Sequence, residues 1–150
     1  SMEPVQVGGI SVGVFICFES TFPSHVRTIG RRSSVLVNLS DDTWFGDTAE
    51  PEQHLAHAVF RAIENRRDLL RVSGGGISAL IGATGEILSL SSLNRSHDDF
   101  KTGWGLVRRL EEPSWYGTIG DAVPVVSLLV STMGLGLRLR ERRRGRPSPS

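Results

Sequence analysis

The stretch ISVGVFICFES, residues 10–20, decides the fold of this chain. Residues 10–17 are apolar or small and rich in β-branched side chains, which is typical of a buried central strand. Cys17, the only cysteine of the chain, ends this predicted strand, and Glu19 comes two residues later. Ligand sites of open α/β sheets lie at the carboxyl ends of strands. Cys17 is therefore a candidate nucleophile, and the alternative for a lone cysteine is an inert core side chain.

The remaining sequence alternates between helical and strand patterns, which predicts an α/β fold. Pro23 suits the first turn of a helix, and a helix start near Cys17 would favour the thiolate form of its side chain. The longest helical pattern carries apolar residues at a period of 3.6, with a break at Arg66. The predicted helices are Pro23–Arg31 and Glu50–Val72, and the predicted further strands are Ser34–Leu39, Ile77–Ile81, Glu86–Leu90 and Trp104–Leu110.

A polar loop, SDDTWFGD at residues 40–47, follows the second predicted strand. In a parallel sheet this loop would lie beside Cys17, because the carboxyl ends of parallel strands meet at the same end of the sheet. Trp44 and Phe45 could then form the wall of an apolar pocket. The alternative is an ordinary turn whose two aromatic side chains pack on the core.

The composition indicates a globular protein of one domain, with 150 residues, 39% hydrophobic and 22% charged residues. The basic residues gather at the end of the chain, where six arginines and one glutamate follow position 137. Ala122–Leu137 precedes them and carries no charge over 16 residues. This pattern favours a short membrane helix with a cytoplasmic basic flank, and the alternative is a buried terminal helix. No aromatic platform accompanies the tail, so nucleic acid is not an expected partner.

Two further motifs do not indicate a metal site or a cofactor site. His54 and His57 are three residues apart on the long predicted helix, but no third metal ligand lies near them in sequence. We therefore interpret them as part of a polar helix face and expect no metal site. The glycine-rich SGGGIS at residues 73–78 lacks the pattern of a phosphate-binding loop, and no cofactor is expected.

Several of these segments together resemble the bacterial apolipoprotein N-acyltransferases, a membrane-embedded family of the nitrilase superfamily. The motifs are ICFES at 16–20, NLSDDTWFGD at 38–47, RAIENRRDLLRVSGGG at 61–76 and YGTIGD at 116–121, in the order and spacing of that family. The resemblance implies part of a nitrilase-like α-β-β-α sandwich at residues 3–121. It also implies a last membrane helix at 122–137 and a disordered cytoplasmic tail at 138–150.

The resemblance further implies a chemistry and its site. Cys17 matches the nucleophile, which takes an acyl chain from a phospholipid as a thioester and passes it to the N-terminal diacylglyceryl-cysteine of an apolipoprotein. Glu19 matches an active-site acid beside the nucleophile. Phe18, where the family usually has tyrosine, and Trp44 with Phe45 match substrate-binding positions. The implied location is the bacterial inner membrane, with the nitrilase-like domain in the periplasm.

The chain departs from the family pattern at the other catalytic residues. The glutamate and lysine of the family's triad precede the cysteine, whereas here only 16 residues do, and Lys101, the single lysine, follows it. We therefore expect an incomplete fragment that is inactive alone. A soluble nitrilase-like amidase and a non-catalytic binding module are the alternative functions.

Overall fold

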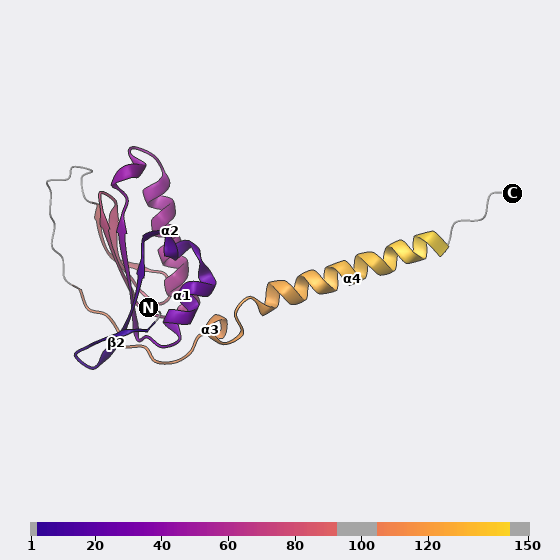
Figure 1. Cartoon of the computed structure of the whole chain (residues 1–150), viewed down its shortest axis with the longest axis horizontal. Helices are drawn as coiled ribbons and strands as arrows, with labels where there is room; N and C mark the ends of the chain where they lie inside the picture. Colours follow the sequence, from indigo (N-terminus) through magenta and orange to yellow (C-terminus); the bar gives the residue numbers. More distant parts are fainter. Residues whose placement is uncertain (1–2, 93–104, 145–150) are drawn as a thin grey trace. The chain divides into compact units, whose positions relative to one another are not determined.

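The computed structural model describes residues 3–92 and 105–144. It contains two units, Ser1–Thr118 and Ile119–Ser150. The elements in chain order (Figure 1) are β1 (Val5–Val7), β2 (Ile10–Ile16), the 3-10 helix η1 (Cys17–Thr21), α1 (Pro23–Gly30), β3 (Val35–Asp41), the 3-10 helix η2 (Thr43–Phe45), α2 (Glu50–Asn65), β4 (Leu69–Gly74), β5 (Ile77–Ile81), β6 (Ile87–Ser92), α3 (Trp115–Ile119) and α4 (Ala122–Arg144).

The strands in the described part of the first unit form one mixed sheet in the order β1-β2-β3-β4-β5-β6. β2, β3 and β4 are parallel, and the remaining neighbours pair antiparallel. Ile16, the last residue of β2, pairs with Leu39, which lies two residues before the end of β3. The loops that follow β2 and β3 therefore lie beside each other at the carboxyl end of the sheet.

Helices α1 and α2 cover one face of this sheet (Figure 1). Each begins with a proline in its first turn, where the missing N–H costs nothing. The buried residues of α2 recur at helical spacing and face the strands. Together the two helices and the covered face enclose one apolar core, made of Phe15, Val26, Ile29, Leu36, Leu55, Ala58, Ala62, Leu69, Ala79 and Ile81.

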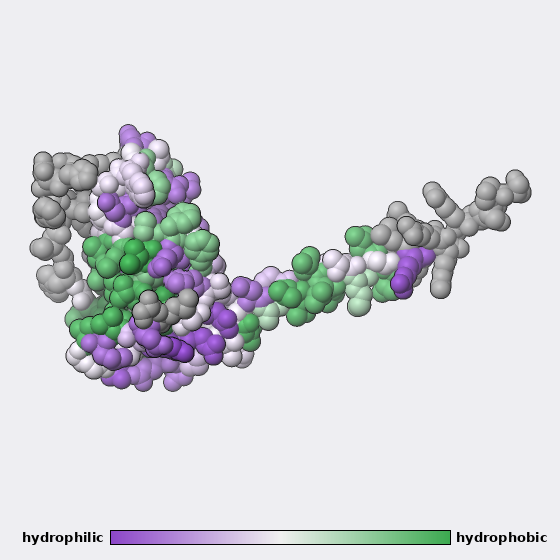
Figure 2. All heavy atoms as spheres, viewed as in Figure 1, coloured by the Kyte–Doolittle hydropathy of each residue, from purple (hydrophilic) through white to green (hydrophobic). Residues whose placement is uncertain are grey.

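The opposite face of the sheet is apolar and open. Side chains alternate between the two faces of a strand, and four large residues of β2, β3 and β4 on this face are exposed: Ile16, Leu39, Leu70 and Val72. They are neighbours in the sheet, because Leu39 pairs with Ile16 on one side and Val72 on the other. An extended apolar area is visible on the first unit in Figure 2.

The predicted helix Glu50–Val72 is wrong beyond Asn65. Arg66 adopts a left-handed conformation with φ 50° and ends α2. The residues of β4 then alternate between buried and exposed, which is the period of a strand and not of a helix. The glycines after β4 form the turn to β5, where Gly75 has φ 62° and glycine meets no steric penalty.

The predicted strand Trp104–Leu110 is also wrong, since residues 105–110 have no regular structure. The Arg108 backbone N–H donates to the Asp68 carboxylate at 2.7 Å instead of to a neighbouring strand. The predicted helix Pro23–Arg31, the predicted strands 10–17 and Ser34–Leu39, and the hairpin of β5 and β6 are confirmed, with ends that differ by one or two residues. The polar sequence of residues 91–102 predicts a loop, but Ser91 and Ser92 belong to β6, and residues 93–102 lie outside the described residues.

The second unit consists mainly of α4, which contains the whole uncharged run 122–137. Within residues 3–92 and 105–144, no helix combines the length and the hydropathy needed to cross a bilayer. The predicted transmembrane span is therefore not confirmed.

Candidate active site

Cys17 directly follows the last residue of β2 and is the first residue of η1. Its backbone is left-handed, with φ 49°, and Arg66 is the only other non-glycine residue in the described ranges with a positive φ. This conformation is unfavourable for any side chain with a Cβ, at a cost of about 1–3 kcal/mol. The thiol is partly exposed and forms no disulfide. A strained cysteine at the carboxyl end of a parallel strand is typical of a functional site.

A cavity of about 460 Å³ opens beside Cys17. Its walls come from the ends of β2 and β3 and from the loop after β3, and they consist of Ile16, Cys17, Leu39, Ser40, Asp41, Thr43 and Trp44. The parallel pairing of β2 with β3 brings these segments together. The structure thus places Cys17 beside Trp44, as the sequence predicts, in a cavity large enough for a small ligand or part of a larger one.

The remaining candidate residues lie around this cavity but do not line it. The Glu19 carboxylate accepts a hydrogen bond from the Ile16 backbone N–H at 2.6 Å and lies 3.5 Å from His25 Nε2. It therefore holds the turn that carries Cys17. The rings of Phe18 and Phe45 both pack near the His54 imidazole, at centroid distances of 6.5 and 6.3 Å.

His54 is the residue that sequence reasoning missed. Only 2% of it is exposed, whereas His57 faces solvent, so the interpretation of both as one polar helix face is wrong for His54. Its Nδ1 lies 2.9 Å from Asp42 Oδ1, and its Nε2 lies 3.1 Å from the Cys17 carbonyl oxygen. The signal was present in the sequence, because His54 shares its helix face with Ala58 and Ala62, four and eight residues later.

A buried network of charged and polar groups connects Asp42 to residues of β3 and β4 near the carboxyl end of the parallel strands. Arg71, fully buried in β4, donates to Asp42 Oδ2 at 2.6 Å and to the side-chain oxygen of Asn38. Asn38 in turn donates to the Phe15 carbonyl at 3.3 Å. Burial raises the pKa of Asp42, but the hydrogen bond from His54 and the charge of Arg71 outweigh it and hold this pKa well below its usual range. Asp42 is therefore an anion inside the protein.

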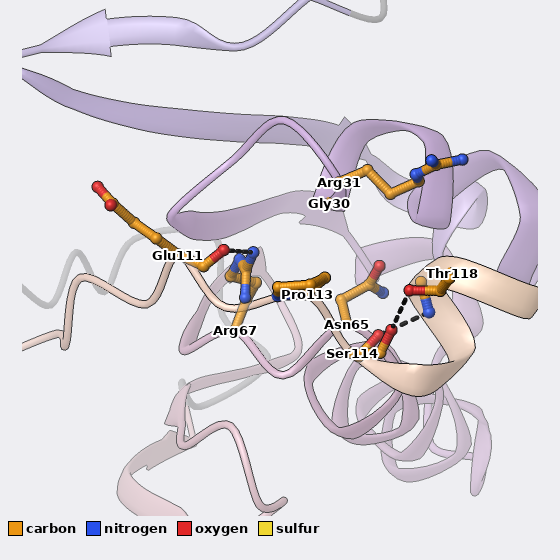
Figure 3. Close-up of a pocket in the computed structure, with 9 residues that line it drawn as sticks. Gly30, Arg31, Asn65, Arg67, Glu111, Pro113, Ser114 and Thr118 are labelled. Atoms are coloured by element: carbon orange, nitrogen blue, oxygen red, sulfur yellow. Dashed lines mark hydrogen bonds between the residues drawn. The ribbon is translucent and has the colours of Figure 1, made fainter.

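A second cavity, of about 190 Å³, lies elsewhere in the first unit, between the ends of α1 and α2 and the segment 111–118 (Figure 3). Arg67 is buried here, and its guanidinium donates to the backbone carbonyls of Ser33, Glu111 and Glu112. Arg67 thus fastens this segment to the sheet and has a structural role. Across the described ranges, no group of three or more His, Cys, Asp or Glu residues could hold a metal ion.

These features define the class of protein: an α/β fold with a cysteine at a strained strand end, facing a cavity. The carbon-nitrogen hydrolase family matches residues 1–96, and the chain belongs to this family. Two solved structures share the fold. They are a nitrilase-superfamily member of branch 10 from Saccharomyces cerevisiae (TM-score 0.54, 18% identity, 61% of this chain and 37% of that one) and a carbon-nitrogen hydrolase from Helicobacter pylori (0.52, 18%, 60% and 39%).

Curated relatives give a narrower similarity. The chain is 38% identical over 118 residues to a Geobacter metallireducens protein named apolipoprotein N-acyltransferase, which covers 78% of this chain and 22% of that protein. Proteins of the same name from Bdellovibrio bacteriovorus (41% over 88 residues, 58% and 16%) and Rickettsia typhi (31% over 125 residues, 81% and 24%) are also similar. The chain spans less than a quarter of the length of each of these relatives.

Proposed function

We propose that this chain is the nucleophile-bearing part of an apolipoprotein N-acyltransferase. The observation that carries the proposal is the position of Cys17. It is the strained residue at the end of β2, it shares a cavity with Trp44, and it lies in a chain 38% identical over 118 residues to a protein of that name. The proposed acyl donor is a phospholipid, and the acceptor is the N-terminus of an apolipoprotein.

The proposed reaction has two halves. The Cys17 thiol gives up its proton, the thiolate attacks the ester carbonyl of the phospholipid, and the carbon–oxygen bond breaks. The lysophospholipid leaves with the proton from the thiol on its new hydroxyl. The α-amino group of the diacylglyceryl-cysteine then attacks the thioester. An amide forms, the carbon–sulfur bond breaks, and the proton lost by the amine restores the free enzyme. No redox partner or metal enters this balance.

The surrounding residues have proposed roles that follow from their contacts. Glu19 fixes the turn through the Ile16 N–H, beside the nucleophile. Trp44, 79% exposed, is held by a hydrogen bond from Nε1 to the Asp41 carbonyl at 2.9 Å, and its ring is positioned to contact an acyl chain in the cavity. Phe18 and Phe45 shield the His54 side of the site.

The test is a hybrid enzyme in which this chain replaces the matched 22% of the Geobacter metallireducens relative. Purified in detergent, the hybrid is expected to transfer a labelled acyl chain from phospholipid to a diacylglyceryl peptide, and its Cys17→Ser variant is expected to show no transfer. The unmodified relative is the positive control. A folded hybrid whose transfer survives Cys17→Ser would overturn the proposal.

The 150-residue chain assayed alone is expected to show no transfer from phospholipid. An unactivated ester needs a general base and a group that stabilises the oxyanion, and neither a glutamate nor a lysine is among the described residues that line the cavity beside Cys17. Transfer by this chain alone, abolished by Cys17→Ala, would contradict this expectation.

We further propose that α4 attaches the protein to a bacterial inner membrane, with its arginine-rich end on the cytoplasmic side and the first unit in the periplasm. Most side chains of its uncharged part are apolar, and the hydroxyls of Ser131 and Thr132 donate to backbone carbonyls of the same helix, a bond that leaves no unsatisfied donor in lipid. The full chain is expected to float with vesicles containing phosphatidylglycerol, whereas a chain ending at Asp121 stays behind. Equal recovery of both would overturn the attachment.

A further inference from the structure

The buried imidazole of His54 bridges two parts of the first unit that the sequence keeps apart. His54 belongs to α2, Asp42 to the loop after β3, and Cys17 to the junction of β2 and η1. The ring contacts both at hydrogen-bond distance, 2.9 Å to the Asp42 carboxylate and 3.1 Å to the Cys17 carbonyl. The side chain of Asp42 is fully buried and that of His54 nearly so, so water does not compete for these bonds.

The chemistry of the Cys17 carbonyl decides which ring nitrogen must donate to it. A carbonyl oxygen can only accept a hydrogen bond, so Nε2 carries the proton in this contact. Asp42 holds the ring through Nδ1 and also receives the Arg71 guanidinium at 2.6 Å. The groups that face the ring are thus Asp42 from the loop after β3, the Cys17 carbonyl from η1, and the Phe18 and Phe45 rings, with Arg71 of β4 behind Asp42.

The acceptor on the other side is the carbonyl of the strained residue itself. Cys17 has φ 49°, a conformation that surrounding structure must hold in place. The Cys17–Phe18 peptide is trans and planar, so its N–H points opposite to the carbonyl that His54 binds. One hydrogen bond from His54 therefore fixes the direction of the Phe18 N–H. It also fixes the orientation of the backbone that carries the Cys17 thiol.

We propose that His54, oriented by Asp42, is a positioning residue that holds Cys17 in its left-handed conformation. The part of this inference that concerns catalysis rests on the proposed function, since it takes Cys17 as the nucleophile. The part that concerns geometry does not. His54 touches no substrate atom and acts through the Cys17 backbone.

The first experiment measures the rate at which iodoacetamide alkylates Cys17 in the 150-residue chain, whose single cysteine makes the signal unambiguous. His54→Asn is too short to reach the Cys17 carbonyl and should react several-fold more slowly, because the thiol is no longer held at the edge of its cavity. His54→Gln places an amide donor near the position of Nε2 and should recover much of the rate. His57→Asn, the exposed histidine on the same helix, is the matched control and should match wild type.

The second experiment needs no variant and decides the matter if His54→Asn does not fold. Nitrogen-15 NMR of the wild-type histidine rings should show a proton on Nε2 of His54, the nitrogen that faces the Cys17 carbonyl. A His54 ring without a proton on Nε2 would overturn the proposal, as would equal alkylation rates for folded His54→Asn and wild type, or a His54→Gln rate no better than that of His54→Asn. Neither readout uses an acyl donor, so failure of acyl transfer with these results intact would count against the proposed function alone.

Discussion

The two faces of the sheet differ in burial, and β4 contributes side chains to both. Leu69, Arg71 and Ser73 point to the face that α1 and α2 cover and are buried, while Leu70 and Val72 point to the other face and are 39% and 45% exposed. The covered face buries an arginine and a carboxylate, each with a partner. The open face carries large apolar side chains in contact with water. The buried ion pair is therefore formed within this unit, whereas the apolar residues of the open face are not enclosed.

Cys17 lies where these two faces meet. Its carbonyl is bound by His54 from the covered side, and its cavity is walled by Ile16 and Leu39 from the open side. The covered face thus supplies rigidity, and the open face supplies an apolar surface suited to a fatty acyl chain. Changes on the two faces should have separable effects on stability and on surface properties.

The largest expected effect comes from breaking the buried ion pair. Arg71→Met leaves the Asp42 carboxylate without its cation in a dry environment, and the free energy of unfolding should fall by about 3–5 kcal/mol. Urea unfolding followed by tryptophan fluorescence measures it. The control is Arg109→Met, whose partner Glu111 is exposed like itself, and which should cost under about 1 kcal/mol. Equal stability of the two variants would contradict the comparison.

The next effect compares adjacent leucines. Leu69→Ala creates a cavity beneath the helices and should lower the free energy of unfolding by about 2–5 kcal/mol. Leu70→Ala, one residue later on the open face, removes a side chain that already touches water and should cost about 1 kcal/mol or less. Thermal unfolding by circular dichroism measures both, and a larger loss for Leu70→Ala would show that the open face is not open.

The pH dependence of stability tests whether the buried carboxylates are ionised, and its expected effect is smaller. The pKa of Asp42 is held below its ordinary value of 3.8, as is the pKa of Asp68, which burial raises but the hydrogen bonds from Arg108 lower by more. Both groups therefore contribute stability that is complete above about pH 4 and is lost as pH falls below that value. Asp42→Asn should reduce the slope of the free energy of unfolding against pH in this range, by up to the equivalent of one bound proton. An unchanged slope between pH 4 and pH 2 would refute the buried anion.

The smallest effect on stability belongs to the open face. Val72→Lys places a charge in water and should change the free energy of unfolding by about 0.5 kcal/mol or less. It should also reduce binding of the dye ANS, because it interrupts the apolar area formed with Leu39 and Leu70. ANS fluorescence that does not change would locate the exposed apolar surface elsewhere.

Much of the fold could be predicted from local patterns, and the errors have physical causes. The strand before Cys17 and the loop with Trp44 follow from β-branched runs and polar strand ends, and the structure places them side by side. The predicted helix extends beyond α2 because Leu69 and Leu70 resume its spacing after the break at Arg66. The left-handed Arg66 ends the helix at that break, and one interrupted position does not by itself predict a helix end.

The site was harder to predict because its polar network is tertiary. His54, Asp42 and Arg71 come from three elements, and only the folded sheet brings them to one carbonyl. A histidine three residues from another histidine favoured a solvent-exposed interpretation, although its spacing from Ala58 and Ala62 placed it on the buried face. The thioester role of Cys17 and the membrane attachment of α4 stay predictions.

Acylation of Cys17 by an activated ester tests the central claim, that the fold presents this thiol as a nucleophile. A 4-nitrophenyl acyl ester has a good leaving group and so needs neither the glutamate nor the lysine of the family. Intact mass and peptide mapping of the 150-residue chain should show one acyl group on Cys17, formed several-fold faster in the folded chain than in the urea-unfolded chain at the same pH. Acylation that maps to other residues, or that proceeds no faster in the folded chain, would contradict the account.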